Sequence, residues 1–143
     1  MSITLSPTLL IVEDSPSELE LMSYYLADSG YKIIKATGAR EAFEMALTEK
    51  PNIIVTDVVM PGMSGFELCR LLRKNPATQG LGIIICSSKR LEIDRLWGMR
   101  QGANAYITKP YTRDELLKVI KSLSGNNIDD SSMTNVSSSK YLD

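Results

Sequence analysis

Histidine is absent from the 143-residue chain, so no imidazole can serve here as a base, a metal ligand or a phosphate carrier. Cysteine is nearly absent: Cys69 and Cys86 make no disulfide framework and no metal-binding motif, and we expect both to be small apolar core residues. If phosphate chemistry takes place on this chain, a carboxylate or a hydroxyl must carry it.

Long apolar runs are also missing. No stretch approaches the ~18 apolar residues that a membrane-spanning helix needs, and the first residues lack the basic start of a secretion signal. Neither sign of charge dominates, because the formal net charge is −1, which gives no electrostatic case for binding nucleic acid or a membrane surface. We therefore expect a cytoplasmic protein with no nucleic-acid partner and no membrane partner.

What the chain does contain is an alternation of short β-rich runs with helical periodicity. The runs are rich in Ile and Val and apolar on both faces, as in parallel strands that helices cover on both sides. They are Thr8–Glu13, Lys32–Ala36, Ile53–Asp57, Gly82–Ser87 and Ala105–Thr108. This pattern predicts an α/β fold, a (βα)5 doubly wound five-stranded parallel sheet of the flavodoxin-like type.

The sequence indicates several helix boundaries. Three starts carry the capping-box pattern of a Ser or Thr followed three residues later by Glu. These pairs are Ser15 with Glu18, Ser64 with Glu67, and Thr112 with Glu115. Helix ends are expected at Ser29-Gly30 and at Asn75-Pro76.

The helix after the fourth strand carries the single tryptophan. Ile93, Leu96 and Met99 recur every three residues, which predicts that they face inward, with Arg95 facing water. Trp97 lies to one side of this stripe and is expected to be partly exposed, either in core packing or in a partner contact.

One domain is expected over residues 8–124, after a short extension formed by residues 1–7. Residues 125–143 are polar and rich in Ser, Asn and Asp, which predicts a disordered tail.

The carboxyl ends of the predicted strands carry an unusual set of polar residues. Glu13 and Asp14 end the first strand, Asp57 ends the third, Ser87 the fourth, and Lys109 follows the fifth. In a doubly wound sheet ligands bind outside these ends, so three carboxylates, a hydroxyl and an ammonium should meet on one rim. Asp57 capping its own turn and Lys109 as a plain surface lysine are the ordinary alternatives.

This set predicts a chemistry. Clustered carboxylates stay ionised together only with a cation, and Mg²⁺ suits their oxygens. Asp57 could then attack phosphorus and form an aspartyl phosphate, with Lys109 and Ser87 binding the phosphoryl oxygens. The Lys109-Pro110 sequence also suggests a cis peptide bond.

These residues resemble the CheY-like receiver domain of two-component response regulators. The matching pieces are LLIVEDSPSE, IIVTDVVMPGMSGFELCRLLR, IIICSS and GANAYITKP, and the resemblance, with the spacing between them, covers residues 8 to about 124. The resemblance implies that Asp57 is the phosphoacceptor and that Asp14 is a direct Mg²⁺ ligand. Glu13 would act mainly through water, and the backbone carbonyl of Val59 would be a further ligand.

The resemblance also assigns a switch. Ser87 resembles the hydroxyl that moves toward the phosphate, Lys109 the phosphate-binding lysine, and Tyr106 the aromatic residue that turns inward with Ser87. Trp97, Tyr106 and Tyr111 are then candidates for a face that contacts a partner.

The expected function is that of a stand-alone response regulator, not an enzyme in the usual sense. A histidine kinase would phosphorylate Asp57, and the face made by the fourth helix, fifth strand and fifth helix would signal to a downstream target protein, with a phosphorylation-dependent dimer as a further expectation. The segment DRLWGMRQGANAYITKP resembles receivers of type IV pilus chemotaxis and cyanobacterial phototaxis systems, which points to motility or taxis.

A phosphorelay intermediate, a phosphate sink and a phosphorylation-independent binding module stay open. A haloacid-dehalogenase-like phosphatase would need a second acid where Val59 stands. A flavodoxin would need a hydroxyl-rich phosphate loop where the chain has the acidic turn Glu13-Asp14-Ser15-Pro16.

Overall fold

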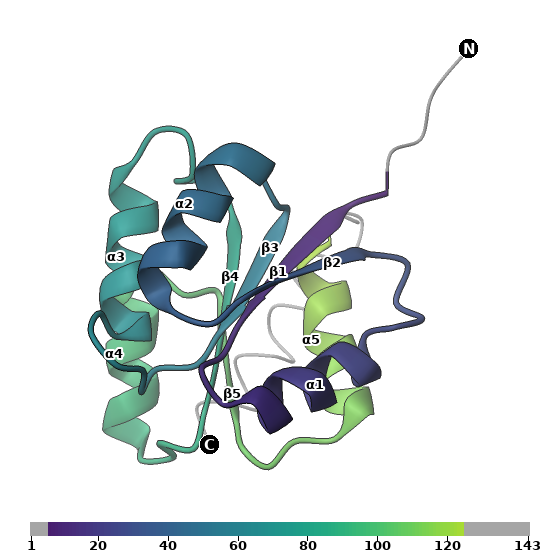
Figure 1. Ribbon diagram of the computed structural model, residues 1–143. Helices are drawn as coiled ribbons and strands as arrows, with labels where there is room; N and C mark the ends of the chain where they lie inside the picture. Colours follow the sequence, from purple (N-terminus) through teal and green to yellow (C-terminus); the bar gives the residue numbers. More distant parts are fainter. Residues whose placement is uncertain (1–5, 125–143) are drawn as a thin grey trace.

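The computed structural model describes residues 6–124, so most of the predicted extension and all of the predicted disordered tail lie outside the described residues. Strands and helices alternate along the chain (Figure 1). The strands are β1 (Thr8–Val12), β2 (Lys32–Ala36), β3 (Ile53–Thr56), β4 (Gly82–Ser87) and β5 (Ala105–Thr108). The helices are α1 (Pro16–Tyr25), α2 (Ala39–Glu49), α3 (Gly65–Lys74), α4 (Glu92–Gln101) and α5 (Arg113–Leu123). Within residues 6–124, none of these helices has the length and apolar character to cross a membrane.

The five strands form one sheet in the order β2-β1-β3-β4-β5, and every neighbouring pair is parallel. Helices α1 and α5 cover one face, whereas α2, α3 and α4 cover the other (Figure 1). The predicted doubly wound (βα)5 fold is therefore confirmed. Because the chain winds in both directions from β1, the carboxyl ends of β1 and β3 lie side by side at the centre of the sheet.

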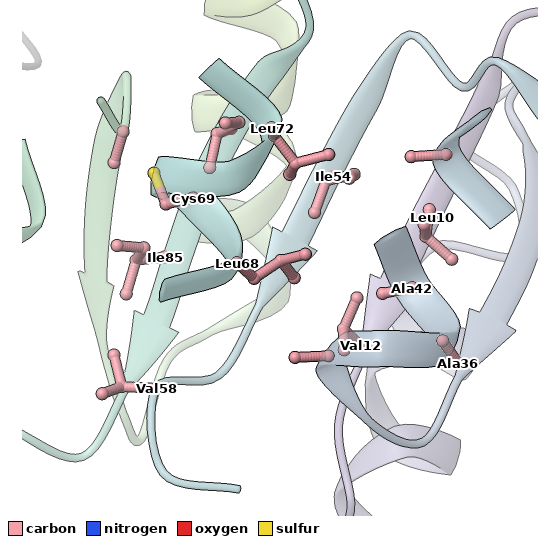
Figure 2. Close-up of a cluster of buried hydrophobic side chains, with 14 of the residues drawn as sticks. Leu10, Val12, Ala36, Ala42, Ile54, Val58, Leu68, Cys69, Leu72 and Ile85 are labelled. Atoms are coloured by element: carbon pink, nitrogen blue, oxygen red, sulfur yellow. The ribbon is translucent and has the colours of Figure 1, made fainter. Parts of the chain in front are cut away.

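Each face of the sheet builds its own core, because side chains alternate between the faces along a strand. Ile54 of β3 lies next to Leu68 and Leu72 of α3, and Leu10 of β1 lies next to Ala42 of α2, all in one cluster (Figure 2). Their neighbours on the opposite face, such as Leu9, join the residues of α1 and α5 in a second cluster. The cysteines are free and divide between the two clusters, Cys69 in the first and Cys86 in the second, as predicted for small apolar residues.

The strands match the predicted ranges except at two ends. β1 ends at Val12 and β3 at Thr56, one residue earlier than expected. Glu13 and Asp57 are still fixed to the sheet, because the Glu13 amide donates to the Ala36 carbonyl and the Asp57 amide to the Val12 carbonyl, both at 3.1 Å. The backbone that carries each carboxylate is therefore held in place by the sheet.

The predicted capping boxes of α3 and α5 are confirmed, with reciprocal bonds between Ser64 and Glu67 and between Thr112 and Glu115. In α1 the prediction is only half right. Ser15 accepts from the Glu18 amide, but the Glu18 carboxylate does not reach back to Ser15; it binds Lys109.

The predicted end of α3 is confirmed, because the helix stops at Lys74 and Asn75 forms its cap. The predicted end of α1 at Ser29-Gly30 is late: the helix ends at Tyr25, and Leu26 caps it.

The predicted inward face of α4 is wrong. Ile93, Leu96 and Met99 are exposed, Ile93 to 65%, and Arg95 is half-buried. The buried position of α4 is Gly98, whose missing side chain lets the helix backbone lie close to the sheet. A Cβ added there would lie 3.1 Å from both Ile85 Cδ1 and Tyr106 Cδ2, so a larger residue fits only if these side chains shift by a few tenths of an ångström. Glycine carries no hydrophobic signal, which explains why the apolar pattern indicated the opposite face.

Candidate functional site

Three carboxylates meet at the carboxyl edge of the sheet. One oxygen from each of Glu13, Asp14 and Asp57 lies within 4.8 Å of the other two. Glu13 is only 2% exposed and Asp57 only 9%, whereas Asp14 is exposed. The structure therefore brings together the three acids that the sequence placed on one rim.

The electrostatics of this cluster call for a cation. Burial raises the pKa of Glu13 above its ordinary value, and the neighbouring charge of Asp57 adds to the rise, against the hydrogen bond from Lys109. A dication bound to all three oxygens would favour the ionised carboxylates and relieve their mutual repulsion. Three carboxylates at such spacing, with one side open to water, fit the oxygen coordination of Mg²⁺.

The Asp57 carboxylate is oriented by its own backbone. The amide of Val58 donates to Asp57 Oδ1 at 2.7 Å. The other oxygen, Oδ2, lies 3.6 Å from Lys109 Nζ. Val59, the proposed carbonyl ligand, follows in the loop between β3 and α3, and its side chain points to solvent at 59% exposure.

Lys109 reaches the cluster from the end of β5. Its peptide bond to Pro110 is cis, as the sequence suggested. Lys109 Nζ donates to Glu13 Oε1 at 2.7 Å and also binds the Glu18 carboxylate of α1. Burial alone would lower the pKa of Lys109, but the hydrogen bonds to Glu13 and Glu18 outweigh it and hold the pKa above its ordinary value. The sequence does not indicate this contact of Glu18, because the spacing of Glu18 from Ser15 fits a helix cap.

Ser87 and Tyr106 are adjacent and buried. Ser87 Oγ accepts from the Lys89 amide at 3.1 Å, and the Tyr106 hydroxyl donates to the Lys89 carbonyl at 2.7 Å. Burial raises the pKa of Tyr106 to about 12, although its hydrogen bond with Ser87 offsets part of the rise. The Tyr106 ring thus occupies the interior, next to the loop that follows β4.

The three aromatic residues expected on a partner face do not share one exposed surface. Tyr106 is buried, and Tyr111 is half-buried against Tyr25 in an edge-on contact with 5.7 Å between ring centroids. Trp97 is 45% exposed, as expected. Its exposed apolar neighbours belong to α4 and the residue before it: Leu91, Ile93, Leu96 and Met99.

Comparisons with known proteins agree with this geometry. Residues 9–121 match the family model described as the response regulator receiver domain. The protein PilH of Pseudomonas aeruginosa is 39% identical over 115 residues, which cover 80% of this chain and 95% of PilH. The alkaline phosphatase synthesis transcriptional regulatory protein PhoP of Bacillus subtilis is 36% identical, but this chain matches only 47% of its length.

Solved structures give the same result. The chemotaxis response regulator CheY4 of Vibrio cholerae superposes with a TM-score of 0.78 at 28% identity, covering 83% of this chain and 99% of CheY4. The CheY-like receiver domain protein of Methanospirillum hungatei superposes with a TM-score of 0.76 at 28% identity, covering 82% and 92% of the two chains. The chain therefore belongs to the response regulator receiver domain family, whose members are signalling modules.

Proposed function

We propose that residues 8–124 work as a phosphorylated signalling switch with Asp57 as the phosphoacceptor. The observation that carries this proposal is the surroundings of one buried carboxylate: Asp57 lies within 4.8 Å of Glu13 and Asp14 and 3.6 Å from the Lys109 ammonium. Buried acids gathered beside a half-buried ammonium are typical of functional sites, because burial of such charges is costly.

The transfer itself needs little beyond positioning and charge. An Asp57 oxygen attacks the phosphorus of a phosphohistidine, the phosphorus–nitrogen bond breaks, and its electron pair leaves on the imidazole, which takes up a proton. Glu13, Asp14, Asp57 and the Val59 carbonyl would hold Mg²⁺, which neutralises charge on the transferring phosphoryl group. Lys109 would bind one phosphoryl oxygen and Ser87 another. The phosphodonor is a histidine kinase, as expected for the family.

Ser87 and Tyr106 are proposed to transmit the effect of phosphorylation to the rest of the domain. Both touch Lys89, so a movement of Ser87 toward a phosphoryl group would disturb the loop that leads into α4. The exposed apolar residues of α4, Trp97 among them, give that helix a surface that a target protein could cover. This surface favours output by protein contact over a pure relay or sink, and the likeness to the chemotaxis regulator CheY4 supports a role in motility or taxis.

The test is the intact mass of the protein after incubation with Mg²⁺ and a small phosphodonor. Acetyl phosphate and phosphoramidate should each add one phosphoryl group to the wild type. Asp57→Asn should add none, and omission of Mg²⁺ should abolish the gain. The control is Asp28→Asn, an exposed carboxylate whose only described ion pair is with Arg113 at 4.0 Å, and it should react as the wild type does. Equal labelling of Asp57→Asn and wild type would refute the assignment.

Phosphorylation-dependent dimerisation is tested on the same samples. Sedimentation velocity with and without beryllium fluoride, which mimics the phosphoryl group, should show whether the modified protein associates. An unchanged monomer would exclude the dimer while leaving the phosphoacceptor assignment intact.

A further inference from the structure

Glu18 has a role that its sequence position does not suggest. Three residues after Ser15 it completes a capping-box pattern, yet its carboxylate makes no bond to the Ser15 amide. That amide is directed at Glu13 Oε2 instead, at 3.4 Å. The Glu18 carboxylate is thereby left to bind Lys109, which lies 91 positions away in the sequence.

Lys109 is consequently shared between a buried acid and a peripheral one. Glu13 lies inside the carboxylate cluster, whereas the Glu18 side chain is 48% exposed on the first turn of α1. Both acids and Lys109 line a cavity of about 470 Å³ between α1 and the segment after β5, which leaves the ammonium room to move. Tyr25 and Tyr111 also line this cavity.

The ammonium and a bound dication would compete for the same oxygen. Lys109 Nζ lies 2.7 Å from Glu13 Oε1, and Glu13 is also one of the three acids grouped as a metal site. Two cations at one carboxylate repel each other, and a lysine displaced from Glu13 into a half-buried position needs another acceptor. Glu18 already contacts the ammonium and is that acceptor.

We propose that Glu18 is a positioning residue that holds the Lys109 ammonium at the edge of the acid cluster, so that a divalent cation can occupy Glu13. The inference rests on the proposed function of the cluster as a Mg²⁺ site. Glu18 does not touch the phosphoryl group in this scheme; it acts through Lys109. Losing it leaves Lys109 on Glu13, where it opposes metal binding.

The experiment is a calorimetric titration of the full chain with MgCl₂ at constant ionic strength. Glu18→Gln should raise the Kd for Mg²⁺ by about three- to tenfold, because the Glu18 side chain is 48% exposed and solvent reduces what its contact with Lys109 contributes to that of an ordinary hydrogen bond. The matched control is Glu20→Gln, which makes the same change in charge on the same helix but removes a different pair, with Lys35 at 3.5 Å. Glu20→Gln should change the Kd by less than about twofold, as for an exposed pair.

A second comparison separates positioning from simple attraction between Glu18 and the metal. In a Lys109→Gln background, Glu18 has no ammonium to hold, so Glu18→Gln should then change the Mg²⁺ Kd no more than Glu20→Gln does. An undiminished effect of Glu18→Gln in that background would show that its charge acts directly, and the inference would be overturned. Equal Kd values for Glu18→Gln and wild type would overturn it as well.

The result is distinguishable from failure of the proposed function. A wild type that gains no phosphoryl group and binds no Mg²⁺ refutes both proposals. A wild type that binds Mg²⁺ and becomes phosphorylated, with Glu18→Gln indistinguishable from it, refutes only the role of Glu18. Thermal unfolding of each variant checks that the fold is retained, since Ser15 still caps α1 in all of them.

Discussion

Gly65→Ala adds one methyl group at the point where α3 begins under the loop that carries Asp57. A Cβ built on Gly65 lies 2.0 Å from the Asp57 carbonyl oxygen and 3.0 Å from Val58 Cα. Ordinary van der Waals contact begins at 3.4 Å, and both neighbours are backbone atoms that no rotamer change can move. The Gly65 amide also donates to the Val58 carbonyl at 2.9 Å, which ties the helix start to this loop. The added methyl must therefore displace the backbone on either side of Asp57.

The magnitude follows from two opposing effects. Alanine is favoured over glycine by up to about 1 kcal/mol within a helix and by less in its first turn. Overpacking against fixed atoms costs about 1–3 kcal/mol or more, and a 2.0 Å approach to a backbone oxygen belongs at the upper end. We expect a net loss of about 2 kcal/mol in the free energy of unfolding, or about 8 °C in Tm for a domain of this size. Because the displaced loop carries Asp57 and Val59, the Kd for Mg²⁺ should rise as well.

The assay is urea denaturation followed by circular dichroism, with Mg²⁺ titration of the folded variant. The control is Gly80→Ala, which makes the same substitution where an added Cβ has nothing within 4 Å. Gly80→Ala should change the free energy of unfolding by less than about 0.5 kcal/mol. If Gly65→Ala is as stable as Gly80→Ala and binds Mg²⁺ equally well, the close approach of α3 to the Asp57 loop does not constrain the site.

Four further predictions concern stability and the switch. Ser64→Ala should lower the free energy of unfolding by ~1 kcal/mol, because it removes the side-chain cap of α3. An unchanged midpoint in urea denaturation would contradict this prediction. Arg73→Met should cost ~2–3 kcal/mol in the same assay, because the guanidinium donates to several backbone carbonyls, among them that of Gly102 at 2.9 Å; a loss below 1 kcal/mol would refute this. Gly98→Ala should shift the NMR signals of the Tyr106 ring, because Cδ2 of the ring would lie 3.1 Å from the new Cβ. Unchanged ring signals would show that α4 moves away from the sheet and the ring stays in place. Since burial raises the pKa of Tyr106 from 10.0 to about 12, the stability that its neutral hydroxyl provides is complete below pH 10.0 and is lost as the pH rises toward 12. The free energy of unfolding should fall by at most about 1.4 kcal/mol per pH unit in this range. Tm measured against pH should show this decrease in the wild type and not in Tyr106→Phe.

The sequence alone determined the sheet and the group of residues at its carboxyl edge. The runs at 9–12 and 83–86 are apolar on both faces, which is the pattern of strands in a parallel sheet that helices cover on both sides, and their alternation with helical periodicity selects that fold. Once the strands are placed, Asp57, Glu13 and Lys109 all lie at the same edge, because parallel strands end at one edge of a sheet. These predictions needed only the period of the pattern and the residues at its ends.

The tertiary structure alone decided how the side chains are paired. The spacing of Ser15 and Glu18 fits a capping box, yet the Lys109 ammonium, just after β5, binds the Glu18 carboxylate instead. No local pattern contains that contact, because a charge-assisted bond between distant segments depends on how the sheet brings them together.

The orientation of α4 was decided in the same way. Ile93 and Met99 form the stronger apolar pattern, but Gly98 faces the sheet, where an added Cβ would lie only 3.1 Å from side-chain atoms of Tyr106 and Ile85. Hydrophobic periodicity depends on apolar side chains, so it does not detect a helix face that packs through its backbone. The sequence therefore determined which elements form and where the acids gather, whereas the packing of those elements decided which partner each charge takes and which apolar side chains remain exposed to solvent.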